Sequence, residues 1–300
     1  MIFQFFIFLN HVFKIIILNE IFNLILSHYT ALHFAADGNN SELVQILLSL
    51  PEIEIGASFK GCKKLENVSL PSTLTELNNG AFKNCSSLVY VAIPSSVKKI
   101  GISAFEACSS LKEIQIPSSV SMIESSAFLN CTSLNKVMLP TSINTINPYT
   151  FCGCKSLTQI TIPSSLTIIS QQAFYGCSSL TQIHIPSSVV SIGSLAFHEC
   201  SSLKDVTFQN PSSLKCISSF LFKSCIALEK ISIPDSVTKI ESGAFQYCSS
   251  LIDVLIPCSV SEIGAVAFNG CSSLKQVTIP TSLTNIGQYA FNPKTNICFK

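Results

Sequence analysis

The sequence predicts an α/β repeat solenoid, with a parallel β-sheet on one face and short helical or 3-10 turns on the other. Three observations carry this prediction: a 23-residue period, a strand-like segment that ends in proline in most periods, and a hydrophobic composition. Hydrophobic residues make up 47% of the 300 residues and charged residues only 12%. A chain with so little charge must bury much of its surface.

Phenylalanine and cysteine set the period. Phe recurs every 23 residues, apart from one step of 25, and a Cys follows three residues after each Phe except the last. The phenylalanines are Phe59, Phe82, Phe105, Phe128, Phe151, Phe174, Phe197, Phe222, Phe245, Phe268 and Phe291. The cysteines are Cys62, Cys85, Cys108, Cys131, Cys154, Cys177, Cys200, Cys225, Cys248 and Cys271. So many copies in register exclude chance, and they define a repeat domain over residues 56–300.

Each period contains one expected strand. Leu111, Ile114 and Ile116 illustrate a segment that is β-branched and alternates at its end, and Pro117 stops it because proline lacks the N–H of a sheet ladder. The following V-x-x-I-G-x-x-A-F stretch has apolar residues three to five apart. We expect one or two turns of α or 3-10 helix there.

Stacking of the units would bury what one unit cannot bury alone. Equivalent residues then repeat about every 4.8 Å, with Leu, Ile, Val, Ala, Phe and Cys pointing inward. The single longer step falls at residues 206–211, where two extra residues delay the proline. We interpret it as a loop bulge, with a functional kink in the binding surface as the alternative.

The cysteines favour a structural role, because a thiol packs as a small buried apolar group. Two alternatives are less favoured: disulfides between neighbouring coils would need special geometry at every step, and a zinc site would lack a C-x-x-C motif. Four cysteines lie outside the ladder and are the candidates for exposed thiols: Cys152, Cys216, Cys258 and Cys298. The scattered histidines and acids form no catalytic motif, so we expect no catalytic residues, no metal and no cofactor.

Charge argues against nucleic acid as a partner. The net charge is +1, and all 18 basic residues are lysine. Arginine, which recognises phosphate and guanine in a bidentate manner, is absent from the sequence. Protein partners are therefore favoured.

The repeat resembles the 23-residue leucine-rich repeats of the BspA type, also called the treponemal class, in its order of Leu, Ile, Ile-Pro, Val, Ile-Gly and Ala-Phe. The resemblance covers residues 56–292 and implies a leucine-rich-repeat arc, a right-handed horseshoe used for protein binding. It also implies a surface antigen or adhesin that binds host matrix or cell-surface proteins. The last coil ends without a polar capping helix, and we expect it to be exposed or sealed by another chain.

The N-terminal residues are different. Residues 29–55 resemble an ankyrin repeat, with Thr30, Leu32, His33 and the Ala35-Ala36 pair in the family's order, although Ala31 replaces the usual Pro. The hydrophobic segment 1–28 leaves three interpretations open: a buried or ankyrin-type helix, an atypical signal or membrane anchor, and translated sequence upstream of the true start. Membrane association therefore stays open.

The outward side of the predicted sheet is the candidate binding surface. Its selected residues are Val89, Tyr90, Lys112, Gln115, Lys136, Met138, Gln159, Gln182, His184, Lys230, Ile252 and Leu255. Apolar pairs at Val89–Tyr90 and at Ile252 with Leu255 are the expected anchors, against the alternative that they are tolerated surface residues. The glycosylation sequons at Asn39, Asn67, Asn84 and Asn130 weakly favour a secreted or cell-surface protein. The alternative is a cytoplasmic scaffold built from ankyrin and leucine-rich repeats.

Overall fold

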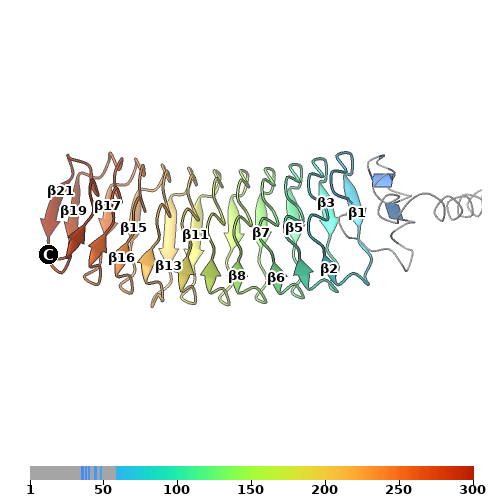
Figure 1. Cartoon of the computed structure of the whole chain (residues 1–300), viewed down its shortest axis with the longest axis horizontal. Coiled ribbons are helices and arrows are strands. Elements are labelled where there is room, and N and C mark those ends of the chain that lie inside the picture. The colour runs from blue at the N-terminus through green and yellow to red at the C-terminus, as the bar shows by residue number, and fades with distance from the viewer. Residues whose placement is uncertain (1–34, 37, 39, 41–43, 46–47, 49–58) are drawn as a thin grey trace, which may run out of the picture.

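The computed structural model describes residues 59–300 together with Ala35, Ala36, Gly38, Asn40, Val44, Gln45 and Leu48. Residues 59–300 form an elongated stack of coils, with β1 at the N-terminal end and β21 at the other (Figure 1). The strands run across the long axis, so the hydrogen bonds between neighbouring coils run along it.

Each coil contributes strands to two walls. We call the first the long-strand wall, because its strands have three or four residues. It consists of β1 (Asn67–Ser69), β3 (Tyr90–Ala92), β5 (Glu113–Gln115), β7 (Lys136–Met138), β9 (Gln159–Thr161), β11 (Gln182–Ile185), β13 (Asp205–Phe208), β15 (Lys230–Ser232), β17 (Asp253–Leu255), β19 (Gln276–Ile279) and β21 (Asn296–Phe299). This is the wall that the sequence predicts.

The second, short-strand wall has two residues per coil. It consists of β2 (Glu76–Leu77), β4 (Lys99–Ile100), β6 (Met122–Ile123), β8 (Thr145–Ile146), β10 (Ile168–Ile169), β12 (Ser191–Ile192), β14 (Cys216–Ile217), β16 (Lys239–Ile240), β18 (Glu262–Ile263) and β20 (Asn285–Ile286).

Strand pairing is parallel in both walls, each of which is divided into sheets of two to four strands. Every pairing keeps the 23-residue step except that of β19 with β21, where Gln276 pairs with Asn296. Val137 of β7 lies opposite Ile160 of β9, and Ile146 of β8 lies opposite Ile169 of β10, each pair being 23 residues apart.

From β1 to β19, the second residue of each long strand points inward, between outward-pointing first and third residues, as in the exposed–buried–exposed pattern of β7. The inward and outward assignment made from the sequence is therefore confirmed along these strands. The last strand, β21, departs from this pattern because its second residue, Ile297, is exposed.

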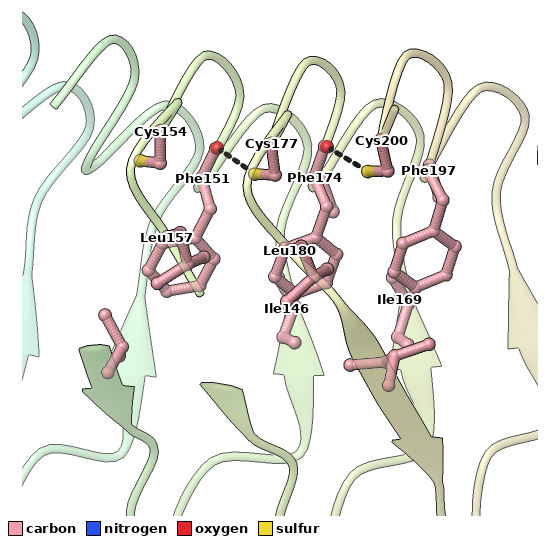
Figure 2. Close-up of a cluster of buried hydrophobic side chains, with 14 of the residues drawn as sticks. Ile146, Phe151, Cys154, Leu157, Ile169, Phe174, Cys177, Leu180, Phe197 and Cys200 are labelled. Atoms are coloured by element: carbon pink, nitrogen blue, oxygen red, sulfur yellow. Dashed lines mark hydrogen bonds between the residues drawn. The ribbon is translucent and has the colours of Figure 1, made fainter. Parts of the chain in front are cut away.

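A continuous column of phenylalanine rings fills the interior. Rings of successive coils from Phe59 to Phe291 stack with centroids 5.0–5.6 Å apart. Leu157, Leu180, Ile146 and Ile169 pack beside this column (Figure 2). Such offset stacking adds specific ring–ring attraction to the burial of apolar surface.

The predicted helical turns are wrong within residues 59–300. The V-x-x-I segment forms the short-strand wall, and A-F-x-x-C is a run of tight turns in which the residues two before and two after each Phe generally have positive φ, as at Ser126 and Asn130, both at 59°. Positive φ interrupts a right-handed helix. The N–H of Phe128 instead donates to the carbonyl of Thr150 in the next coil, at 2.9 Å, while that of Cys131 donates locally to Phe128.

The two extra residues of the long step lie after Phe208, in a bulge of the connection between β13 and β14. Asp205 of β13 still pairs with Gln182 of β11 at the usual 23-residue step. Past the bulge, Phe222 stacks on Phe197 with centroids 5.6 Å apart. The column therefore continues through the irregular coil, and the loop-bulge interpretation is confirmed.

The N-terminal predictions fall mostly outside the described residues. Ala35, Ala36, Val44, Gln45 and Leu48 are helical, but the rest of the ankyrin-like segment 29–55 is largely undescribed, and segment 1–28 lies entirely outside. Both assignments stay predictions. Within the part of the chain that the structure describes, no helix has the length and apolar character needed to cross a bilayer.

Candidate protein-binding surface on the long-strand wall

All twelve residues selected from the sequence lie exposed on the long-strand wall or at the start of its strands. The most exposed of the apolar ones are Met138 at 62% and Leu255 at 59%. Both project outward because each is the third residue of its strand, next to the inward-facing second residue. The structure thus places them on one surface, and their role in binding stays a prediction.

The structure also shows a hollow that the sequence analysis missed. We call it the central trough. It has a volume of about 430 Å³, spans β7, β9, β11 and β13, and is lined by Lys136, Gln159, Ile160, Thr161, Gln182, Ile183, His184, Asp205 and Thr207. Ile160 is half-buried, unlike its equivalents Val137 and Ile183, which are buried. The trough therefore has an apolar floor between polar sides.

A second hollow of about 450 Å³ lies between β17 and β19. The predicted anchors Ile252 and Leu255 line it, together with Lys275 and Lys300. The two hollows include only some of the selected residues: Val89 and Tyr90 lie on β3 or just before it, two coils before the central trough begins at β7, and line neither hollow.

The polar side chains of the central trough are largely without partners in the protein. Among the described residues, Lys136, Gln159, Gln182 and Asp205 make no side-chain hydrogen bond, and the four ion pairs involve other residues. The exception is His184, whose Nδ1 lies 2.9 Å from Oγ1 of Thr207. These donors and acceptors face solvent and are available to a ligand.

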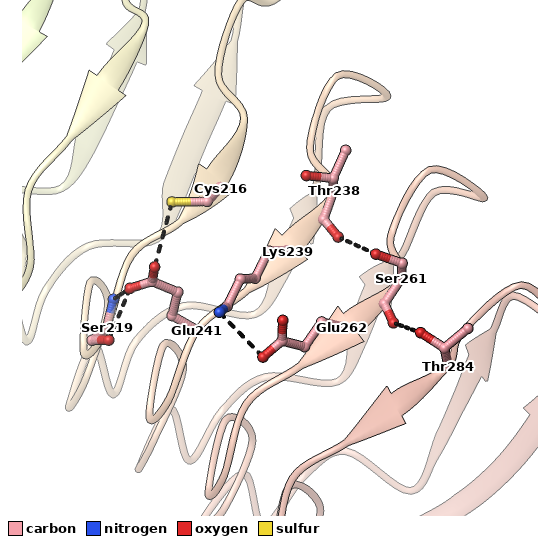
Figure 3. A network of polar contacts seen from close by, with 8 residues as sticks. All are labelled: Cys216, Ser219, Thr238, Lys239, Glu241, Ser261, Glu262 and Thr284. Atoms are coloured by element: carbon pink, nitrogen blue, oxygen red, sulfur yellow. Dashed lines mark hydrogen bonds and ion pairs between the residues drawn. The ribbon is translucent and has the colours of Figure 1, made fainter.

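Several polar side chains on the side of the short-strand wall have partners in a neighbouring coil. Lys239 forms an ion pair with Glu262 at 3.1 Å, and the carboxylate of Glu241 accepts hydrogen bonds of 2.9 Å from the backbone N–H and the hydroxyl of Ser219 (Figure 3). The hydroxyl of Thr284 donates to the carbonyl of Ser261 at 3.0 Å. Polar groups on this wall tie one coil to the next.

The cysteine ladder is structural. Each ladder thiol from Cys85 to Cys271 donates to the carbonyl of the Phe in the preceding coil, for example Cys177 to Phe151 at 3.1 Å and Cys200 to Phe174 at 3.2 Å (Figure 2). Burial raises the pKa of these thiols, to about 12 at Cys271 and further in the middle of the stack. The neighbouring ladder thiols raise the pKa of Cys177 and Cys131 as well. These cysteines therefore stay protonated and unreactive at neutral pH.

All fourteen cysteines lie among the described residues, and none is in a disulfide. Of the four outside the ladder, Cys258 is exposed and the other three are half-buried. Burial raises the pKa of Cys152. The Sγ of Cys216 lies 3.9 Å from a carboxylate oxygen of Glu241, at the limit of a weak hydrogen bond.

The described residues contain no group of three or more His, Cys, Asp or Glu side chains that could hold a metal ion. Of the two described histidines, His198 is the more buried, and it makes contacts within the fold. Its Nδ1 lies 2.8 Å from the carbonyl oxygen of Lys223, and its ring packs edge-on against Tyr175. The chemistry that this surface offers is therefore hydrogen bonding, charge and apolar contact.

Fold and surface together define a class: a parallel-strand solenoid of stacked 23-residue coils with one open sheet face. Residues 53–181 and 167–298 match the family model described as "BspA type Leucine rich repeat region (6 copies)". The chain belongs to this family of leucine-rich repeat proteins. Solenoids of this kind are typically non-enzymatic protein-interaction folds.

Solved structures agree with this assignment. A leucine rich cell surface protein from Faecalibacterium prausnitzii is 32% identical, with a TM-score of 0.54, and the match covers 82% of each chain. A leucine-rich repeat protein from Eubacterium ventriosum is 25% identical, with a TM-score of 0.55 and coverage of 79% of this chain and 78% of the other. The pneumococcal vaccine antigen PcpA is 25% identical, with a TM-score of 0.50 and coverage of 78% and 72%. No curated protein matches the chain.

Proposed function

We propose that the chain is the protein-binding module of a cell-surface antigen, and that it binds host matrix or cell-surface proteins through the long-strand wall. One observation carries the proposal: among the described residues, this wall combines two hollows, exposed apolar side chains and polar side chains without hydrogen-bonding partners in the protein. The similarity to a bacterial cell surface protein and to a vaccine antigen supports the location.

The apolar residues supply the binding energy in this proposal. Leu255 is more than half exposed and Ile252 is half exposed, and both line a hollow. Tyr90 and Val89 form a less exposed apolar pair on another part of the wall. A few such anchors usually dominate an interface, whereas the polar residues around them set its specificity.

Binding can be tested with purified extracellular matrix proteins and variants of the chain. Leu255→Asp, on the long-strand wall, should lower the affinity for a bound matrix protein about tenfold or more. The matched control is Ile168→Asp, which places the same charge at an exposed apolar position of the short-strand wall. An equal loss in both variants, or no saturable binding to any matrix protein, contradicts the proposed surface.

Location can be tested on intact cells with an amine reagent that does not cross membranes. Exposed lysines such as Lys112, Lys136 and Lys230 should be labelled without permeabilisation if the chain is displayed on the surface. Labelling only after permeabilisation would contradict surface display and would favour an intracellular scaffold. A cytosolic protein of the same cells serves as the control for leakage.

A further inference from the structure

The central trough has opposite charges at its two ends. Lys136 lies on β7 at one end and Asp205 on β13 at the other, with Gln159 and Gln182 between them in the same position of the repeat. Neither charged group makes an ion pair among the described residues. The lining is therefore positive at one end, uncharged in the middle and negative at the other end.

The spacing of these groups matches an extended polypeptide. Three strand spacings of about 4.8 Å separate Lys136 from Asp205, or about 14 Å in all. Alternate residues of an extended chain share a face, and four steps of about 3.3 Å place the first and fifth residues about 13 Å apart. The third residue then lies over the half-buried side chain of Ile160 on the floor.

We propose that the central trough holds an extended polypeptide segment of about five residues, with an acidic residue over Lys136, a small apolar residue over Ile160 and a basic residue over Asp205. This inference rests on the proposed function and names the partner chemistry of that wall. Gln159 and Gln182 offer amide groups that can both donate to and accept from the segment's backbone. Apart from His184, no aromatic side chain lines the trough, so a polysaccharide finds little surface on which to stack its sugar rings.

Charges just outside the trough limit the expected effect. Glu113 lies beside Lys136 on β5, and Lys230 occupies the equivalent position on β15, beyond Asp205. Each weakens the field of its neighbour without lining the hollow. Solvent also screens exposed pairs, so each charge contact should change affinity by roughly fivefold and not by orders of magnitude.

The test uses three blocked peptides that differ only in end charge: Glu-Thr-Val-Thr-Lys, Glu-Thr-Val-Thr-Glu and Lys-Thr-Val-Thr-Lys. Their binding to the full chain is measured by calorimetric titration at low salt, into the millimolar range. The native chain should bind the mixed-charge peptide roughly fivefold more tightly than either of the others. Equal affinities, or no saturable binding of the mixed-charge peptide, would overturn the proposal.

Two variants distinguish the trough from general electrostatics. Asp205→Lys makes both ends positive, so preference should switch to the doubly acidic peptide. Asp253→Lys makes the same substitution in the equivalent position of β17. Asp253 lines the hollow between β17 and β19 and not the central trough, so the preference among the three peptides should stay unchanged. A switch caused equally by Asp253→Lys would overturn the assignment. Thermal unfolding of both variants confirms that they are folded.

Failure here can be separated from failure of the proposed function. Leu255→Asp tests the hollow between β17 and β19, which shares no lining residue with the central trough. If matrix binding depends on Leu255 and the three peptides bind alike, the peptide proposal fails alone.

Discussion

The two walls of the solenoid use the same inward alternation and opposite outward chemistry. On the short-strand wall and in the turns, polar groups bond to a neighbouring coil, as Lys239 does to Glu262 in the next coil and as the ladder thiols do to phenylalanine carbonyls in the preceding coil. On the long-strand wall, Lys136, Gln182 and Asp205 have no such partner among the described residues. One set of polar side chains joins neighbouring coils, and the other set faces solvent, where we propose that it contacts a ligand.

The largest expected effect comes from the turns. The ladder thiols have a higher pKa in the folded chain than the ordinary value of 9.0, so their protonation stabilises the fold fully below about pH 9. That contribution is lost as the pH rises through the folded-state values, which reach about 12 at Cys271. In the presence of a reductant, the urea concentration at the midpoint of unfolding should therefore fall steeply between about pH 9 and pH 12.

Replacing three ladder thiols isolates this cause. A chain with Cys108→Ala, Cys131→Ala and Cys154→Ala should show a pH dependence shallower by up to about three protons, because each buried thiol releases about one proton on unfolding. The slopes are compared, and not the stabilities, because alanine also removes a thiol contact. An unchanged slope would show that other groups, such as lysines, control alkaline unfolding.

The next largest loss of stability is expected from substitutions in the interior of the short-strand wall. Ile169→Asp should lower the free energy of unfolding by about 4 kcal/mol, because it places an unpaired charge in a fully buried position. Ile168→Asp, on the same strand but 39% exposed, should cost about 1 kcal/mol or less. Chemical denaturation measures both, and equal losses would show that this segment is not a strand.

The long-strand wall offers the parallel comparison. Ile162→Asp should cost about 3 kcal/mol, somewhat less than Ile169→Asp because Ile162 retains 9% exposure. Its neighbour Thr161 is exposed, so Thr161→Asp should be nearly silent. The same denaturation experiment measures both variants. A large loss of stability in Thr161→Asp would show that the inward and outward assignment is reversed.

The smallest expected effect compares single polar side chains of the two kinds. The hydroxyl of Ser165 donates to the carbonyl of Ile143 at 2.8 Å, and Ser165→Ala should cost about 1 kcal/mol because that carbonyl loses its donor. Gln182→Ala should change stability by less than about 0.5 kcal/mol, since its amide has no partner among the described residues. Similar losses of stability in the two variants would contradict the distinction between polar side chains with and without partners in the protein.

The sequence predicts the long-strand wall well because two local signals coincide there. Alternation of Ile114 and its neighbours indicates a strand, and Pro117 ends it. The short-strand wall has neither signal. Val120 and Ile123 are three residues apart, a spacing that favours a helical turn, and only tertiary pairing with the neighbouring coils makes this segment a strand.

Two other features leave no trace in the sequence for physical reasons. Glycine occupies some left-handed positions, such as Gly153, but others are occupied by residues that do not usually adopt positive φ, such as Leu195 and Val266, so no regular glycine pattern marks the turns. The central trough depends on how far the side chains around Ile160 leave its surface open. Periodicity assigns a side chain to a face, but it does not tell how completely its neighbours cover it.

The direction of the hydrogen bonds has a mechanical consequence. Because bonds between coils run along the long axis (Figure 1), tension applied between the two ends loads the bonds of the terminal coil one after another, instead of shearing many together. The stack should unravel coil by coil from an end. Each released coil of 23 residues then lengthens the chain by about 70 Å, which gives a series of equal steps to a molecule anchored at one end and pulled at the other.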